Sequence, residues 1–315
     1  MKRWHVVSCC ACMALVAVLF LGTNISEQLK QYYEASIWIR TGRKKRQLLP
    51  FSATCPVASF FSTFYICREK PSDAPPSFHP RWFGGDVTVL CMHYLLAAQI
   101  PPTGILLDIG ANVGLYSLIA ASLGRRVFAI EPLNNHLQLL RKSVEINEFQ
   151  RLITVCPFAL SDRNENVTMK SQVGNTGHSY IARDTYKGCK DCQFRESGEV
   201  STRTITEFLR HPQFASLPME TPAIIKVDTE GHECRIFSVK AGISELFRRL
   251  DVRAIMMEWA FVPLRYVDMS CVSRMVDLLM ANGFQAHRLT GEALNMTLRH
   301  WKVWPDEVLW IKQSE

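Results

Sequence analysis

Short apolar runs alternate with amphipathic segments along most of the chain. Strands are predicted at residues 105–109, 127–130, 153–157, 224–227, 254–257, 286–289 and 308–311, and helices at residues 87–98, 115–123, 136–146, 235–239 and 270–281. The polar stretch 162–202 is predicted to be irregular. Short apolar strands that alternate with helices indicate a parallel sheet covered by helices on both faces. We therefore expect an α/β fold with a mostly parallel central sheet.

The N-terminal pattern is different and predicts a membrane anchor. Residues 6–22 carry no charge, which is just enough for a helix to span a bilayer. Lys2 and Arg3 precede this segment, so the positive-inside rule places the short tail in the cytosol and the rest of the chain across the membrane. The exit at Phe20–Thr23 lacks the small residues of a signal-peptidase site, which favours an uncleaved anchor over the alternative of a cleaved signal peptide.

These segments predict four parts in the chain. They are a cytosolic tail with a single N-terminal transmembrane helix (1–23), a stem (24–50), a lead-in (51–102) and a folded domain (103–315). The stem ends in the basic run 43–46, which is either a solvated linker or a processing site. A short anchor suits the thinner membranes of the early secretory pathway, so a single-pass type II protein of the Golgi or a neighbouring compartment is expected.

Composition narrows the range of functions. With 315 residues, of which 48% are hydrophobic, the chain is not a disordered protein. The net charge of +7 is concentrated in the first 50 residues, where eight Lys and Arg residues accompany only Glu27 and Glu34. The folded body is nearly neutral, so no nucleic-acid partner is expected.

Cysteines and sequons agree with a lumenal location. Eight of the eleven cysteines follow the anchor, an even number that is compatible with disulfides. The pairs expected first are Cys55 with Cys67 and Cys189 with Cys192, although the second pair also has the spacing of half a zinc site. Asn-x-Ser/Thr triplets start at Asn24, Asn166 and Asn295, and the last two are expected to be glycosylated.

A glycine turn and an acidic residue indicate a nucleoside cofactor. Asp108 and the turn Gly110-Ala-Asn112-Val-Gly114 follow the first strand of the folded domain, and Glu131 ends the next strand. Such a turn lets a ligand approach a helix N-terminus, and a strand-end acid at this distance can accept hydrogen bonds from ribose hydroxyls. The turn lacks the middle glycine of pyrophosphate sites, and a carboxylate at Asp108 suits a sulfonium. We therefore expect S-adenosylmethionine, bound by Asp108, Gly110, Asn112, Gly114 and Glu131.

A second cluster of titratable side chains follows the fourth strand. Asp228, Glu230, His232 and Glu233 lie within six residues, after Lys226. Acidic capping of the next helix would explain some of them, but the turn adjoins the expected cofactor site, which favours catalysis or acceptor binding. We expect Asp228 to be the base that takes a proton from the acceptor, with Glu230 orienting it and His232 as another candidate. A divalent cation held by Asp228 and its neighbours is an alternative, and Glu258 either positions the acceptor or merely ends its strand.

Several segments in this order resemble the FkbM-type methyltransferases. They are residues 107–114, 130–132, 159–162, 204–209 and the run Ile225-Lys-Val-Asp-Thr-Glu-Gly-His-Glu233, and the resemblance covers roughly residues 103–259. It implies a Rossmann-like methyltransferase domain that uses S-adenosylmethionine, most often on oxygen, with Asp162 as a further cofactor-binding residue. The resemblance gives no information about the acceptor pocket.

Together these features predict an enzyme that methylates a hydroxyl of a glycan or glycolipid in the secretory lumen. The compartment, rather than any pocket residue, indicates the carbohydrate acceptor. One alternative is a cytosol-facing, membrane-anchored enzyme that methylates a lipid or small molecule. Another is a catalytically silent binding protein with the same fold.

Overall fold

The computed structural model describes residues 57–59, 63–66, 87–182, 192–259, 269–296 and 303–313. The expected anchor, the stem and Cys55, Cys67 and Cys189 lie outside these residues. Within the ranges just given, no helix combines the length and the apolar character needed to cross a bilayer.

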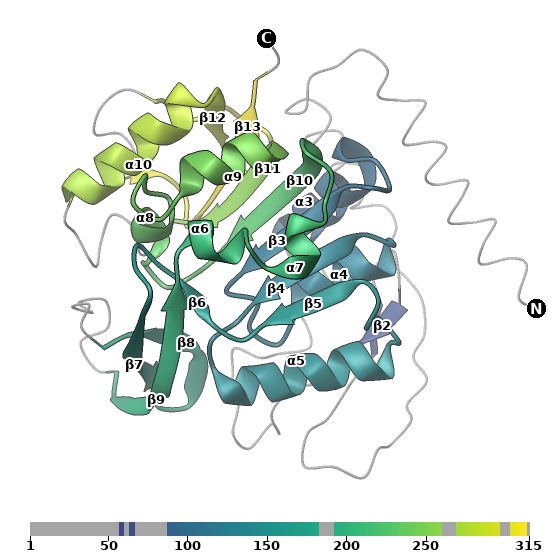
Figure 1. The fold of residues 1–315 in the computed structure, drawn as a ribbon. Helices are drawn as coiled ribbons and strands as arrows, with labels where there is room; N and C mark the ends of the chain where they lie inside the picture. Colours follow the sequence, from purple (N-terminus) through teal and green to yellow (C-terminus); the bar gives the residue numbers. More distant parts are fainter. Residues whose placement is uncertain are drawn as a thin grey trace, which may run out of the picture.

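A seven-stranded sheet forms the centre of the folded domain (Figure 1). Its strands are β3 (Ile105–Ile109), β4 (Arg126–Ile130), β5 (Ile153–Cys156), β10 (Thr221–Val227), β11 (Leu250–Glu258), β12 (Phe284–His287) and β13 (Glu307–Lys312). Their order is β12-β13-β11-β10-β3-β4-β5, with β13 antiparallel to both of its neighbours and the other pairs parallel. The chain runs outward from β3 in one direction and later from β10 in the other, so the strand order reverses between these two strands. Ligands of open α/β sheets bind at such a reversal.

Helices cover both faces of this sheet. One face packs against α3 (Val87–Tyr94), the π-helix η2 (Leu95–Gln99), α4 (Leu115–Ser122) and α5 (Asn134–Ile146). The other packs against the short helices α6 (Ile205–Phe208), α7 (Pro212–Ala215), α8 (Glu233–Ile236) and α9 (Ile243–Arg249), and against α10 (Met269–Ala281). Strand β3 serves both layers, because Leu107 and Ile109 lie in the second core and Leu106 in the first. This burial on both faces explains why the strands are continuous apolar runs in the sequence.

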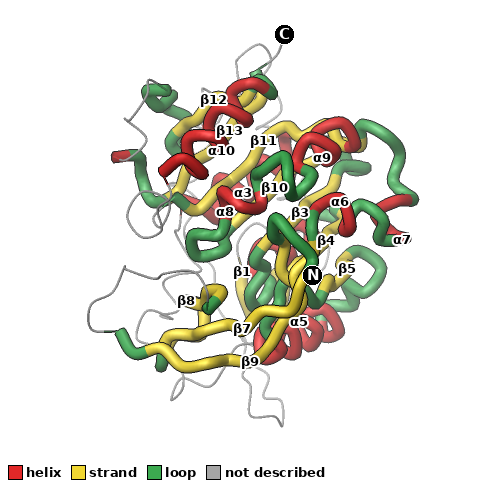
Figure 2. The backbone as a smooth tube through the Cα atoms, turned by 60° about the vertical axis from the view of Figure 1, so that its left-hand side comes forward, coloured by secondary structure: helices red, strands yellow, loops and turns green. Residues whose placement is uncertain are grey.

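The expectation that residues 162–202 are irregular is wrong. They contain β7 (Glu165–Gln172), β8 (Asn175–Ile181) and most of β9 (Phe194–Arg203), which with β6 (Ala159–Leu160) form a four-stranded sheet in the order β6-β9-β7-β8. We call this unit the inserted sheet. Figure 2 shows its long strands beside the central sheet rather than as a continuation of it. Only alternate residues of β7, such as Val167 and Met169, are buried, so the segment has a polar composition although it forms strands.

The predicted strands and helices of the central layer are confirmed, with ends that differ by a few residues. Helices α6, α7 and α9 were not predicted, because they are only four to seven residues long. Two further short strands, β1 (Val57–Ser59) and β2 (Thr63–Tyr65), pair antiparallel in the lead-in.

Candidate active site

A cavity of about 430 Å³ opens at the carboxyl ends of the central strands. Its walls come from the turns after β3, β4, β10 and β11, from the start of β13 and from the inserted sheet. Glu131 and Asp228, which the sequence assigned to the cofactor and the acceptor, line this one cavity. The cavity therefore lies where the strand order reverses and joins the two predicted halves of the site.

The glycine turn after β3 depends on residues without a side chain. Gly110 has a φ of +78°, and a Cβ built on it would lie 1.9 Å from the backbone oxygen of Asp228. Gly114 has a φ of +94°, and a Cβ there would lie 2.3 Å from Leu140 Cδ1. Gly110 and Asn112 line the cavity as expected, whereas Gly114 does not and instead allows α4 to pack against α5.

Glu131 is fixed in place by donors from three directions. Its carboxylate accepts hydrogen bonds from the backbone N–H groups of Asn112 and Leu133, each at 2.9 Å, and its Oε1 lies 3.3 Å from His136 Nδ1. A carboxylate has about four lone-pair directions, so roughly one remains for a hydroxyl of a ligand. His136 Nε2 in turn lies 3.0 Å from Thr176 Oγ1 of the inserted sheet. His136 was not among the predicted site residues, because its role depends on this contact across 40 residues.

Asp108 and Asp162, which the sequence assigned to the cofactor, do not line the cavity. Asp108 is fully buried, and its Oδ2 accepts a 2.6 Å hydrogen bond from Ser117 Oγ of α4. Its burial raises its pKa, although the nearby Lys226 ammonium opposes that shift. Asp162 lies 3.4 Å from Lys240 Nζ, and Arg163 and Arg235 are within 4 Å of it. Burial opposes the effect of these cations, but together they lower the pKa of Asp162.

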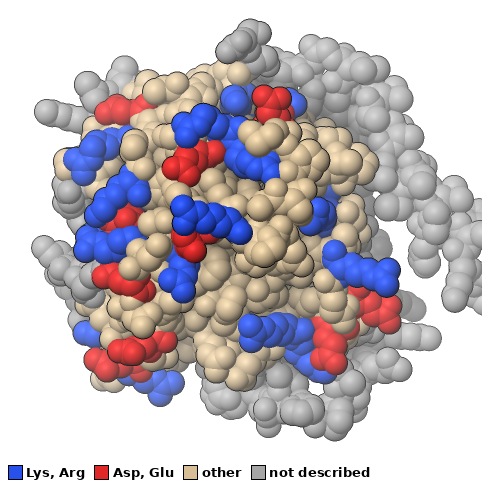
Figure 3. Space-filling view, viewed as in Figure 1, with Lys and Arg blue, Asp and Glu red and all other residues tan. Residues whose placement is uncertain are grey.

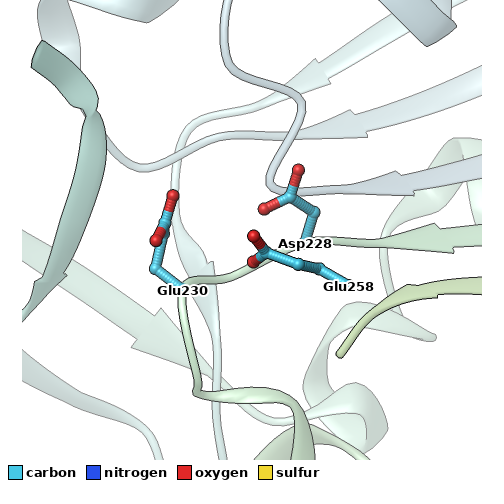
Figure 4. A group of neighbouring side chains, drawn as sticks. All are labelled: Asp228, Glu230 and Glu258. Carbon is cyan, nitrogen blue, oxygen red and sulfur yellow. The ribbon is translucent and has the colours of Figure 1, made fainter. Parts of the chain in front are cut away.

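Three carboxylates gather on the acceptor side of the cavity (Figure 4). Asp228 and Glu230 come from the loop after β10 and Glu258 from the end of β11, and one oxygen from each lies within 4.8 Å of the others. Figure 4 shows the Asp228 and Glu258 carboxyl groups close together, with Glu230 facing them. Glu307 of β13, the register partner of Glu258, adds a fourth acid to the wall. Oxygen ligands in this arrangement could hold a divalent cation.

The acids of this cluster differ in their titration. Burial acts to raise the pKa of Asp228, but the Lys226 ammonium 3.1 Å away, a hydrogen bond with Glu258 and the charge of His178 together outweigh it, and the pKa is lowered. The pKa of Glu258 is raised well above its usual value by burial and then by the charges of Asp228 and Glu230. Within this pair, Glu258 therefore binds a proton more tightly than Asp228 does.

Lys226 connects the two halves of the site. Its ammonium donates hydrogen bonds to the Gly110 carbonyl and to Asp228 Oδ2, both at 3.1 Å, and lies 5.2 Å from the centre of the Tyr116 ring. The glycine turn and the acidic loop thus share one buried cation. This residue belongs to the motif noted in the sequence, but its role was not anticipated.

His232 is part of the loop's support as well as of the cavity wall. Its Nε2 lies 3.0 Å from the hydroxyl of buried Ser161 at the end of β6. The neighbouring Glu233 is fully buried and accepts hydrogen bonds from the N–H and the hydroxyl of Thr229, both at 2.8 Å. These contacts fix the loop that carries Asp228 and Glu230, and they favour a structural role for His232 over the catalytic role considered above.

A disulfide also supports this loop. Cys234 of α8 is bonded to Cys271 of α10, with the Cα atoms 5.7 Å apart. The sequence analysis did not anticipate this pair. Cys192 is also disulfide-bonded, which agrees with the disulfide interpretation of the Cys189 and Cys192 pair, although Cys189 lies outside the described residues.

The inserted sheet supplies the wall that the sequence analysis did not foresee. Asn175 and residues 177–181 of β8 line the cavity, with Met169 of β7 beside them and Ala159 and Leu160 of β6 nearby. The alternation of buried and exposed residues in β7 is the signal that could have revealed a strand here.

Comparison with known proteins agrees with this geometry. The model of the "Methyltransferase FkbM domain" family matches residues 108–286. No curated protein matches the chain significantly. Among solved structures, the FkbM methyltransferase from Methylobacillus flagellatus is 18% identical with a TM-score of 0.38; the match covers 70% of this chain and 47% of that one, so this chain spans about half of that protein.

Two other similar solved structures bear the names of putative O-methyltransferases. A putative O-methyltransferase from Klebsiella pneumoniae is 11% identical over 96% of this chain and 95% of its own, with a TM-score of 0.39. A putative caffeoyl-CoA O-methyltransferase from Staphylococcus aureus is 11% identical over 72% of this chain and 84% of its own, also with a TM-score of 0.39. The family match spans more than half of the chain and includes both the glycine turn and the acidic loop. The chain is therefore a member of the FkbM methyltransferase family, whose cofactor is S-adenosylmethionine.

Proposed function

We propose that this protein transfers a methyl group from S-adenosylmethionine to a hydroxyl of a carbohydrate, on a glycan or glycolipid, in the lumen of the secretory pathway. The observation that carries this proposal is the single cavity that contains both Glu131 beside the glycine turn and the carboxylates around Asp228. A cofactor at the first group and an acceptor at the second would meet in one enclosed space.

The residues on the cofactor side fit this nucleoside. Glu131 has an acceptor position for a ribose hydroxyl, Ala159 and Leu160 offer an apolar surface for the base, and Gly110 belongs to the turn that lines the cavity. The nearby acids complement a positive sulfonium. When bound, the cofactor supplies an activated methyl group and a sulfur that leaves as a neutral thioether.

The acceptor side suits a neutral, hydroxylated molecule. The side chains of Asp228, Glu230, Glu258 and Glu307 can form hydrogen bonds with hydroxyls, and those that are ionised repel phosphates and carboxylates. Asp228, held by Lys226, aligns the acceptor oxygen, and alignment supplies much of the rate of a methyl transfer. On the face shown in Figure 3, basic and acidic side chains are interspersed, which also gives no support for a nucleic-acid acceptor.

Three features support the secretory location. The Cys234–Cys271 disulfide is typical of an oxidising compartment. The side chains of Asn166 and Asn295 are exposed, as glycosylation at either sequon requires. The apolar N-terminal segment supplies the anchor that a single-pass type II topology needs.

The test is incubation of the purified full-length protein with isotope-labelled S-adenosylmethionine and a panel of neutral and sialylated or sulfated glycans and glycolipids. Mass spectrometry is expected to find the label on a neutral sugar hydroxyl. Parallel reactions with a chelator decide whether the acids around Asp228 need a divalent cation. A well-folded protein that does not bind the cofactor by calorimetry would overturn the proposal.

The variant Asp228→Asn separates alignment from cofactor binding. We expect its affinity for the cofactor to stay within about threefold of the parent and its turnover to fall by at least about 100-fold. Glu199→Gln is the matched control, because Glu199 is an exposed acid of β9 outside the cavity wall. An Asp228→Asn enzyme with parental turnover would contradict the assigned role.

A further inference from the structure

Part of β8 leaves the regular ladder of the inserted sheet. Ser171 of β7 pairs with Ser179 of β8, whereas the next residue of β7, Gln172, pairs with Asn175. The register therefore advances by one residue in β7 and by four in β8, so residues 176–178 bulge from the ladder. We call these residues the β8 bulge. Bulges turn side chains away from the ladder, and they are frequent beside active sites.

The first residue of the β8 bulge contacts the cofactor half of the cavity. Thr176 Oγ1 lies 3.0 Å from His136 Nε2, and His136 Nδ1 lies 3.3 Å from Glu131 Oε1. A carboxylate only accepts hydrogen bonds, so Nδ1 carries the proton of the neutral ring and Nε2 accepts a hydrogen bond from the Thr176 hydroxyl. This chain of hydrogen bonds joins the inserted sheet to the acid that is expected to bind the ribose.

The second residue of the β8 bulge lies against the glycine turn. A Cβ built on Gly177 would lie 3.5 Å from Asn112 Nδ2, which places the backbone of β8 beside the turn after β3. The backbone N–H of Asn112 donates a hydrogen bond to Glu131 Oε2 at 2.9 Å. The β8 bulge therefore contacts two of the residues that hold Glu131, namely His136 and Asn112.

Hydrogen bonds between β7 and β8 hold the β8 bulge in its shape. The Ser179 hydroxyl donates to the Thr176 carbonyl at 2.6 Å and lies 2.7 Å from the hydroxyl of Ser171, which is buried. The single proton of the Ser179 hydroxyl is directed to Thr176, so the Ser171 hydroxyl donates to Ser179. The backbone of Thr176 is thereby fixed from within the inserted sheet, and its side chain connects that sheet to α5.

Apolar contacts also hold the inserted sheet against the rest of the domain. Leu133, which precedes α5, packs in a small core with Val167, Met169 and Ile181. Apolar attraction is non-directional, whereas a hydrogen bond weakens steeply when it is misaligned. The apolar core therefore stabilises the attachment, and the hydrogen bond of Thr176 to His136 fixes the position of the β8 bulge relative to α5.

The residues that follow Thr176 form part of the acceptor side. His178, Ser179 and Tyr180 line the cavity together with Asp228. The charge of His178 contributes to the lowered pKa of Asp228, which shows that this part of β8 lies near the acidic loop. A displacement of the β8 bulge would therefore move the wall that an acceptor contacts.

We propose that Thr176 is a positioning residue for the acceptor. Its hydroxyl, bound to His136, attaches the β8 bulge to the cofactor half and so sets the position of the acceptor wall relative to the acidic loop. Thr176 is not among the described residues that line the cavity, so it acts through the placement of its neighbours. This assignment rests on the proposed function, because it requires an acceptor on that side of the cavity.

The first experiment measures the attachment of the β8 bulge and needs neither cofactor nor acceptor. Thr176→Val keeps the branched shape of the side chain and removes the hydroxyl. We expect amide hydrogen exchange of residues 177–181 in the full-length protein to become about three- to tenfold faster, as the loss of one hydrogen bond predicts. Thr176→Ser keeps a hydroxyl and is expected to exchange within about twofold of the parent. Thr154→Val is the matched control, because Thr154 is a partly buried threonine of β5 outside the cavity wall.

The second experiment measures catalysis with the neutral glycan that the labelling panel identifies. In Thr176→Val we expect the KM for this glycan to rise by about three- to tenfold. The calorimetric affinity for S-adenosylhomocysteine is expected to stay within about twofold of the parent, because Glu131 keeps its two backbone N–H donors. Thr176→Ser is expected to restore the KM. A general loss of structure would weaken both affinities together, so the difference between them identifies a positioning role.

The two proposals fail in different ways. A parent protein that methylates no glycan overturns the proposed function, and the acceptor role of Thr176 with it. With an active parent, unchanged amide exchange or an unchanged KM in Thr176→Val overturns the role of Thr176 and leaves the proposed function intact. Equal losses of affinity for the glycan and for S-adenosylhomocysteine would show that Thr176 is merely structural, which also overturns the assignment.

Discussion

Gly110 offers the sharpest test of the site, because two strands meet there without room for a side chain. In Gly110→Ala, the new Cβ would lie 1.9 Å from the backbone oxygen of Asp228, well inside the 3.0 Å that real Cβ contacts respect. The obstacle is backbone at the end of β10, which cannot rotate away as a side chain would. The ends of β3 and β10 must therefore separate by roughly 1 Å or more, in an interior that is closely packed.

The expected cost has two parts. Alanine at a φ of +78° is strained by about 1–2 kcal/mol. Forcing the two strand ends apart adds about 1–3 kcal/mol, as overpacking of a core does. The separation also disturbs the 3.1 Å hydrogen bond from Lys226 to the Gly110 carbonyl and the equal one from the Asp228 N–H to Ile109. We therefore expect the free energy of unfolding to fall by about 2–5 kcal/mol and the cofactor affinity to fall with it.

Gly124 provides a matched control. Its φ of +76° is almost the same, but nothing lies within 4 Å of a Cβ built on it. Gly124→Ala therefore carries only the backbone strain, about 1–2 kcal/mol, and leaves the cavity intact. Urea unfolding and calorimetric cofactor titration of both variants measure the difference. If Gly110→Ala were no less stable than Gly124→Ala and bound the cofactor as tightly as the parent, the close packing of β3 against β10 would be refuted.

Three further changes probe the site. Glu131→Gln replaces one acceptor oxygen by a donor that faces a backbone N–H, so we expect at least about tenfold weaker cofactor binding by calorimetry, and unchanged binding would contradict the role of Glu131. Cys234→Ser with Cys271→Ser opens a disulfide across 37 residues and should lower the free energy of unfolding by about 3–4 kcal/mol in urea, whereas an unchanged midpoint would show that the bond is not formed. Glu258 has a raised pKa, so the folded state binds its proton more tightly than the unfolded state, and the free energy of unfolding declines as pH rises from the ordinary glutamate pKa through the raised one. Glu258→Gln should reduce that decline in urea titrations between pH 4 and pH 8. An identical dependence on pH in the variant and the parent would refute the shift.

The central layer was predictable because its strands are buried on both faces. Residues Ile105–Ile109 form a strand of five buried residues, and the glycines that follow it predict the turn at its end. The helix α6 was missed although Thr204 and Glu207 are spaced as a capping box, and Thr204 Oγ1 does accept the Glu207 N–H at 3.2 Å. The inserted sheet was missed because most of β9 is exposed, and an exposed strand carries little apolar alternation.

The site residues at the ends of strands could be predicted from the sequence. The other site residues are brought to the cavity by contacts between segments that are distant in the sequence. Side-chain parity explains why Asp108 does not line the cavity: Leu107 and Ile109 belong to the core against α6–α10, so Asp108 points to the opposite face, towards Ser117. The sequence alone predicts this alternation of side chains along the strand. By contrast, the contact of His136 with Thr176 exists only because β8 folds over the cavity, and no local pattern records such a contact.

The acids of the cavity are more easily explained by function than by stability. The charges of Asp228 and Glu230 disfavour ionisation of Glu258, and Lys226 is shared between Asp228 and the Gly110 carbonyl. The raised pKa of Glu258 is the direct sign of that cost. A fold selected for stability alone would place apolar residues at the ends of β10 and β11, as it does along the rest of these strands. A positively charged ligand beside the acids offsets this cost, so the same charges that destabilise the fold favour binding of a sulfonium, and both effects follow from one local arrangement of carboxylates.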